Sequence, residues 1–194
     1  MAQQINIIQE KQDNILRINK WKFITWLFII SIVMLFASQT SAYLVRRAEG
    51  NWVEFTVPII FYYSTAVLVL SSVFLHLAYL AAKKDKLVQL KTFISIAFAA
   101  GLTFLVMQYY GWQDLQTQGV FLKGNPSGSF FYVLTGLHGF HLVTGLFVIL
   151  FAFIAAFQTK INAKELNRLE VCNTYWHFLD LLWVYLFVFL LYFR

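Results

Sequence analysis

Residues 129–157 read SFFYVLTGLHGFHLVTGLFVILFAFIAAF, a run without a single Asp, Glu, Lys or Arg. About 20 apolar residues suffice for an α-helix to cross the hydrocarbon core of a bilayer, so this run is long enough to span it with a tilt. Its residues do not alternate between polar and apolar as those of a half-buried strand would. The stretch therefore predicts a transmembrane helix, and the rest of the chain follows the same pattern.

Four further apolar runs accompany this one, separated by short polar connections. They cover residues 23–45, 57–82, 92–112 and 174–193. Because lipid permits only helices or closed barrels to span it, we predict an all-α integral membrane bundle of five transmembrane helices. The stretch from Gly124 to Gly128 predicts a turn before the fourth helix. No connection is long enough to fold into a catalytic domain.

The composition fits a membrane protein and argues against two other classes. Hydrophobic residues make up 60% of the chain, charged residues 12%, and the mean hydropathy is +0.66. Soluble domains carry about a quarter charged residues. The net charge of +6 could suggest a nucleic-acid partner, but the basic residues lie between apolar runs and form no continuous stripe. Cys172 is the only cysteine, so no disulfide can form within the chain.

Lys and Arg residues are distributed unevenly between the two sides of the predicted bundle. The side of the N-terminus holds Lys11, Arg17, Lys20, Lys22, Lys83, Lys84, Lys86, Lys91, Lys160, Lys164 and Arg168. The other side holds Arg46, Arg47, Lys123 and Arg194. By the positive-inside rule, the N-terminus is cytoplasmic and the C-terminus periplasmic. The chain then divides into a cytoplasmic segment, residues 1–22, and a transmembrane domain, residues 23–194.

Ionisable side chains within the predicted spans are the first functional candidates, because they are costly in lipid. His138 and His141 share one face of the fourth helix, and His177 and Asp180 repeat that spacing in the fifth. At 1.5 Å per residue, His138 and His177 lie about 16 Å apart in depth, too far to share a metal. His141 and Asp180 differ by about 7 Å in depth and could be bridged. His177 is the partner of Asp180 nearest in sequence.

Several interpretations of these residues remain open at this point. Gly136 and Gly139 favour close helix packing, so the polar groups could simply hydrogen-bond between helices. A proton relay or ion pathway is a second possibility. A small membrane cytochrome is a third, with haem held by His138 or His141 together with His76. Neither of the two prolines interrupts a span, which argues against a transporter of the broken-helix type.

Two stretches resemble the signatures of one known family. Gly128-Ser-Phe-Phe-Tyr-Val-Leu-Thr-Gly-Leu-His138-Gly-Phe-His141-Leu-Val-Thr-Gly145 resembles the pattern G-S-x-F-x-x-T-G-x-H-G-x-H-V-x-x-G of haem–copper oxidase subunit III. Tyr175-Trp176-His177-Phe178-Leu179-Asp180-Leu181-Leu182-Trp183 resembles the second pattern of that family, Y/F-W-H-F-x-D-x-x-W. The chain with its five spans is similar to the bacterial subunit III that lacks the first two of the seven helices of the family. This form occurs in quinol oxidases and in some cytochrome c oxidases.

The resemblance implies an accessory subunit of a proton-pumping terminal oxidase, in the bacterial inner membrane. Members of this family carry no haem or copper, so the resemblance implies no catalytic, metal or cofactor residue in this chain. Implied partners are subunit I above all, then subunit II, further oxidase subunits, membrane phospholipid and other respiratory complexes. The residues implied in interhelical bonding or in contacts with lipid or subunit I are His138, His141, Trp176, His177, Asp180, Gly136 and Gly139.

One departure from the family pattern concerns carboxylates. The family has a Glu in an S-E-x-x-F segment of the helix that is first here, and Ile32 stands in that place. The Glu of the third helix is also missing, with Gly111 nearest to it. No proton-linked role of those carboxylates is therefore carried over to this chain.

Overall fold

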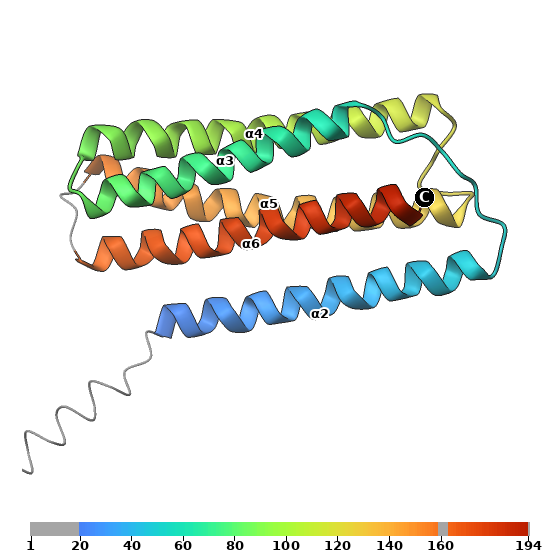
Figure 1. Ribbon diagram of the computed structural model, residues 1–194, viewed down its shortest axis with the longest axis horizontal. Coiled ribbons are helices and arrows are strands. Elements are labelled where there is room, and N and C mark those ends of the chain that lie inside the picture. Colours follow the sequence, from blue (N-terminus) through green and yellow to red (C-terminus); the bar gives the residue numbers. More distant parts are fainter. Residues whose placement is uncertain (1–19, 159–162, 194) are drawn as a thin grey trace, which may run out of the picture.

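The structure, a computed structural model, describes residues 20–158 and 163–193, and these residues form five long helices (Figure 1). The helices are α2 Lys20–Ala48, α3 Ile60–Lys83, α4 Leu87–Thr117, α5 Pro126–Gln158 and α6 Ala163–Phe193. Each is long and apolar enough to cross a membrane, and no strand occurs among the described residues. The prediction of an all-α, multi-pass membrane bundle is therefore confirmed. Most of the segment 1–22 lies outside the described residues.

The helices extend past the apolar runs at several ends. α4 continues to Thr117, beyond Trp112, and α6 begins at Ala163, well before Thr174. Both extensions are polar, and a helix that leaves the hydrocarbon core still satisfies its own backbone groups. At one end of the bundle Lys22 of α2 and Glu170 of α6 form an ion pair at 2.7 Å. The polar extension of α6 thus meets the start of α2.

The start of α5 differs from the predicted turn. The helix begins at Pro126, inside the stretch expected to be a turn. The side-chain oxygen of Asn125 accepts a hydrogen bond from the backbone N–H of Ser127 at 2.9 Å, which is the geometry of a helix cap, and Pro126 occupies the first helical position. Gly128 is required here, because an added Cβ would lie 2.7 Å from the backbone oxygen of Phe121.

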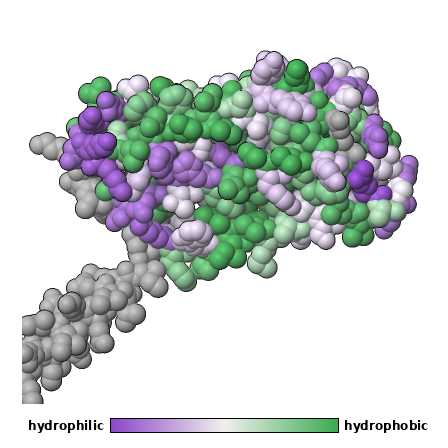
Figure 2. Space-filling model, in the orientation of Figure 1, coloured by the Kyte–Doolittle hydropathy of each residue, from purple (hydrophilic) through white to green (hydrophobic). Residues whose placement is uncertain are grey.

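Four of the helices form a bundle, and the fifth lies along one edge of it (Figure 1). α3 and α4 pack most extensively, and α3–α6, α4–α5 and α5–α6 contacts close the bundle. α2 contacts α5 and α6. We call the end of the bundle that contains Lys20, Lys22, Lys83, Lys84 and Lys86 the lysine-rich end. The outer surface between the two ends is largely apolar, as a lipid-facing surface must be (Figure 2).

Candidate functional site in the bundle interior

His138 of α5 lies at the centre of the bundle, with none of its surface exposed. Its ring lies 4.9 Å from the Trp183 ring of α6, with the two planes 32° apart, and Phe104 of α4 meets it edge-on at 6.3 Å. Neither ring nitrogen has a hydrogen-bond partner within the described part of the chain. The imidazole is therefore enclosed by aromatic rings and packs as part of the core.

Two hydrogen bonds between helices lie near this imidazole. The indole N–H of Trp183 donates to the Thr65 hydroxyl of α3 at 2.9 Å. The side-chain amide of Gln108 on α4 donates to the Ser64 hydroxyl of α3 at 3.0 Å. The hydrocarbon core contains no water that could replace a lost hydrogen bond, so a polar side chain there is stabilised by a partner on a neighbouring helix. Such bonds fix the position of one helix against the next. Sequence reasoning missed Thr65 and Gln108, because single polar residues in an apolar run carry no pairing signal.

Trp176 of α6 is completely buried between two glycines on neighbouring helices. A Cβ added at Gly101 of α4 would lie 2.9 Å from the Trp176 indole, and one added at Gly145 of α5 would lie 3.1 Å from it. At Gly145 the added atom would also meet Leu179 at 2.9 Å. The indole thus fills a slot that exists only because both positions lack a side chain. The sequence indicated close packing along α5, but gave no sign of Gly101 as its counterpart.

Asp180 and His177 are one helical turn apart on α6, and both approach Ser72 of α3. The Ser72 hydroxyl forms a short hydrogen bond with Nδ1 of His177. The same hydroxyl interacts with the buried carboxyl group of Asp180, although neither carboxyl oxygen makes a regular hydrogen bond within the described residues. The partner that the structure gives to His177 is therefore Ser72 and not Asp180. Ser72 can make this contact because α3 packs against α6.

His141 faces away from this group. Its Nδ1 hydrogen-bonds the Leu137 backbone oxygen of its own helix at 2.8 Å, and its ring packs against Phe36 of α2 at 5.7 Å. Asp180 faces α3, so the similar depth of His141 and Asp180 does not bring them together. His138 and His141 also point to different neighbours, because residues three apart on a helix differ by about 60° in direction.

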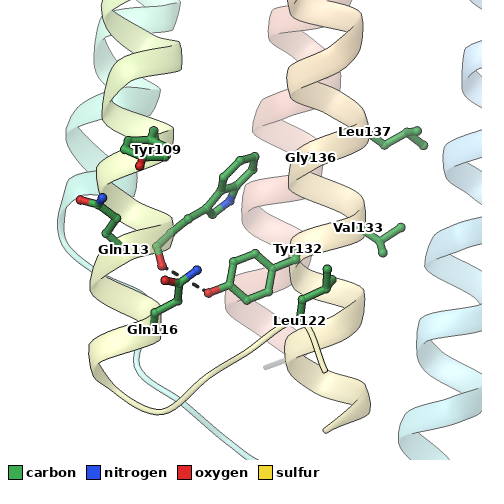
Figure 3. A pocket seen from close by; sticks show the side chains of 9 residues that line it. Tyr109, Gln113, Gln116, Leu122, Tyr132, Val133, Gly136 and Leu137 are labelled. Carbon is green, nitrogen blue, oxygen red and sulfur yellow. Dashed lines mark hydrogen bonds between the residues drawn. The ribbon is translucent and has the colours of Figure 1, made fainter. Parts of the chain in front are cut away.

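The glycines at positions 136 and 139 differ in their surroundings. A Cβ at Gly136 would meet Trp112 of α4 at 3.8 Å, an ordinary contact, whereas nothing lies within 4 Å of a Cβ at Gly139. Gly136 borders a cleft of about 510 Å³ between the ends of α4 and α5 opposite the lysine-rich end (Figure 3). The cleft is lined by Tyr109, Trp112, Gln113, Gln116, Leu122, Tyr132, Val133, Gly136 and Leu137.

The cleft has an apolar inner part and a polar rim. Figure 3 shows Gln113, Gln116 and Tyr132 at one end and Leu137 and Gly136 at the other. The Tyr132 hydroxyl lies 3.2 Å from the backbone oxygen of Trp112 and 2.9 Å from that of Val120. Tyr132 therefore connects α5 to α4 and to the segment that follows α4. An amphiphilic lining of this kind suits an apolar chain joined to an uncharged, hydrogen-bonding group.

The arrangement bears on the metal and haem interpretations. No group of three or more His, Cys, Asp or Glu that could hold a metal ion occurs in residues 20–158 and 163–193. His76 of α3 contacts the His177 ring, 5.6 Å away, and does not meet His138 or His141. The three histidines that the haem hypothesis combined therefore face three different surroundings.

The two positions that depart from the family pattern are both tightly packed. Ile32 of α2 is buried, with 2% of its surface exposed. At Gly111 of α4 an added Cβ would lie 2.7 Å from the Phe61 ring of α3. A Glu at position 111 would require rearrangement of its neighbours, and a Glu at position 32 would bury a carboxyl group.

Comparisons with known proteins agree with the resemblance of the two signatures. A family profile described as "Cytochrome c oxidase subunit III" matches residues 10–194. The "Probable cytochrome c oxidase subunit 3" of Nocardia farcinica is 32% identical over 173 residues, which cover 84% of this chain and 83% of that protein. The "Cytochrome c oxidase subunit 3" of Thermostichus vulcanus is 33% identical over 171 residues, which cover 84% and 82%. That of Bacillus sp. (strain PS3) is 29% identical over 167 residues, which cover 84% and 80%.

Proposed function

The chain belongs to the cytochrome c oxidase subunit III family and is an accessory subunit of a terminal respiratory oxidase. From this premise we propose that it stabilises subunit I, the partner that holds the metal centres, and that it carries no catalytic residue and no redox centre of its own. Subunit II and further oxidase subunits complete the complex. The protein then lies in the bacterial inner membrane, with its N-terminus cytoplasmic, as the excess of Lys and Arg on that side favours.

The observation that carries this proposal is the enclosure of the polar signature residues. His138 and Trp176 have no exposed surface, and the partners they meet are rings and glycines of this same chain. A residue that binds haem or moves a proton needs a ligand or a chain of polar groups beside it. A role in interhelical packing therefore fits His138, His141 and Trp176. His177 and Asp180 both approach Ser72 of α3, and we assign them a role in joining α6 to α3. Gly136 and Gly139, on the outer side of α5, leave room for lipid or a neighbouring subunit.

Purification of the native oxidase through a tag on this chain tests the proposal. We expect the haem-containing subunits to co-purify in equal amounts, and a His138→Phe variant to retain the same haem content per complex. The separated chain should show no stoichiometric haem band in its absorbance spectrum. A haem band that follows this chain, or failure of the haem subunits to co-purify, would contradict the proposal.

We also propose that the cleft beside Gly136 holds one phospholipid. Its apolar inner part can take an acyl chain, and the amide groups of Gln113 and Gln116 can hydrogen-bond the glycerol and ester region at the membrane interface. A Gly136→Leu variant should fill the cleft and lower the phospholipid count of the purified oxidase by one per complex. Val106→Leu, an exposed position on α4 outside the cleft, is the matched control. Equal counts by mass spectrometry in both variants would rule this site out.

A further inference from the structure

One outer face of the bundle carries ionisable groups at membrane depth. It is formed by Val73, His76 and Leu80 of α3 and by His177, Leu181 and Val184 of α6, and we call it the α3–α6 face. His76, Val73, Leu80, Leu181 and Val184 are exposed, and His177 is half-buried. Figure 2 shows hydrophilic side chains reaching from the lysine-rich end into the otherwise apolar surface between these two helices.

The depth of the two imidazoles can be measured independently on the two helices. His76 lies seven residues before Lys83, the last residue of α3, and His177 lies seven residues after Glu170. At 1.5 Å per residue, each lies about 10 Å into the bundle from a charged side chain at its lysine-rich end. The two rings are 5.6 Å apart. The apolar runs of these helices end at residue 82 and begin at residue 174, so the pair lies about 5–9 Å inside the edge of the hydrocarbon core.

Such a pair does not suit a surface that faces lipid. Ionisable residues within spans face the bundle interior, a water-filled cavity or a protein neighbour. Nδ1 of His177 is engaged by Ser72, but the described residues supply no hydrogen bond to either nitrogen of His76. By contrast, no ionisable side chain is exposed near this depth on α2 or α5, where Ile30 and Phe147 are among the exposed residues. The α3–α6 face is thus the surface that most needs a polar cover.

We propose that the α3–α6 face docks against a transmembrane helix of another oxidase subunit, and that this helix carries a carboxyl group at the depth of His76 and His177. The inference rests on the proposed function, since it takes the partner from the same complex. A carboxyl group has two oxygens and can accept hydrogen bonds from two imidazoles at once. Lys83, which lies 4.9 Å from the Tyr79 ring, and the exposed Lys84 add a positive field that also favours an acidic partner.

Two other occupants fit this face less well. Acyl chains would leave the nitrogens of His76 unsatisfied in the hydrocarbon core. A second copy of this chain, docked through the same face, would bring another imidazole pair opposite this one. It would offer no accessible carboxyl group, because Asp180 is buried with 5% of its surface exposed. A different subunit with an acidic side chain is the occupant that can accept hydrogen bonds from the imidazole groups of this face.

Photo-crosslinking in the native oxidase tests the proposal. Val73 is replaced by benzoylphenylalanine, with Phe147 of α5 replaced in the same way as a control on another face. We expect the probe at position 73 to form an adduct with another oxidase subunit, in a transmembrane segment that contains Asp or Glu at the crosslinked depth, and the probe at 147 not to label that segment. An adduct with lipid alone, with a second copy of this chain, or with a segment that lacks Asp and Glu overturns the proposal.

Two substitutions at His76 test the hydrogen bond itself. His76→Phe should weaken retention of this chain in the purified oxidase by about three- to tenfold, the effect of losing one interhelical hydrogen bond in a membrane, whereas His76→Gln should restore most of it. Equal retention of the two variants contradicts the proposed bond. If the unmodified chain co-purifies with the oxidase but position 73 labels only lipid, the docking fails and the accessory-subunit role stands. If the chain does not co-purify, both fail.

Discussion

The imidazole of His138 and the indole of Trp183 lie against each other at 4.9 Å, and each belongs to a different one of the two signature stretches. The two residues are 45 positions apart in sequence, yet they meet inside one bundle. Trp176, which lies against Gly145, repeats the relationship nearer the lysine-rich end. The two signatures therefore bring their residues together at a packing interface between α5 and α6.

Substitution of Gly145 by Ala should destabilise the packing of α5 on α6. The new methyl would lie 2.9 Å from Leu179 and 3.1 Å from Trp176, and overpacking of a dense core costs about 1–3 kcal/mol. Gly139→Ala is the matched control on the same helix, because nothing lies within 4 Å of its Cβ. Thermal unfolding of the purified oxidase should begin at a lower temperature for Gly145→Ala only. Equal behaviour of the two variants would mean that the slot for Trp176 can widen without cost.

Removal of the Thr65 hydroxyl should leave the Trp183 indole N–H without a partner. A buried donor left unsatisfied costs about 1–3 kcal/mol. Thr65→Val should therefore lower the thermal stability of the oxidase, and Trp183→Phe should reduce the further effect of Thr65→Val, with a coupling of about 0.6 kcal/mol. Thr103→Val, at an exposed threonine that bonds only its own helix, serves as the control. Additive effects of the two changes would show that the 2.9 Å contact is not a stabilising bond.

The apolar runs predicted the five helices because lipid leaves few alternatives, but helix ends and side-chain partners depend on neighbours. Asn125 caps α5 earlier than the apolar pattern begins, and the polar start of α6 is helical where it meets α2. Among the candidate residues, spacing grouped His138 with His141, although the first faces the core and the second faces α2. Spacing within one helix predicts the angle between two side chains, but the packing of the bundle decides which neighbouring helix each side chain contacts.

The partners of the candidate residues were harder to predict than the residues themselves. Ser72 and Gly101 contact His177 and Trp176, but a serine or a glycine in an apolar run is common in any membrane helix. The haem hypothesis needed His76 to face the interior. The sequence could not show that His76 is exposed, because α3 carries apolar residues on all of its sides and so has no recognisable outer face.

Asp180→Asn should weaken assembly of the oxidase without slowing the complexes that do assemble. The carboxyl group is buried beside Ser72, and the amide would replace one of its oxygens by an NH₂ group, which donates where the oxygen could accept. We expect less of this chain per haem in the purified oxidase, with oxygen consumption per assembled complex near normal. Normal assembly together with lost proton pumping would contradict a structural role and assign Asp180 to proton transfer.

The ion pair between Lys22 and Glu170 should help to hold α2 against the bundle. α2 contacts only α5 and α6 among the described helices, and this 2.7 Å pair joins its first turn to α6. Both side chains are more than a third exposed, so the pair should contribute no more than about 1 kcal/mol, and less at high salt. Glu170→Lys should lower the thermal stability of the oxidase at low ionic strength, and adding Lys22→Glu should restore it by re-forming the pair with reversed charges. Glu49→Lys is the control. It breaks the ion pair between Arg46, in the last turn of α2, and Glu49, the residue that follows α2, and this pair does not connect α2 to another helix. If the double reversal is no more stable than Glu170→Lys alone, apolar contacts such as Phe36 against His141 hold α2 in place without help from the ion pair.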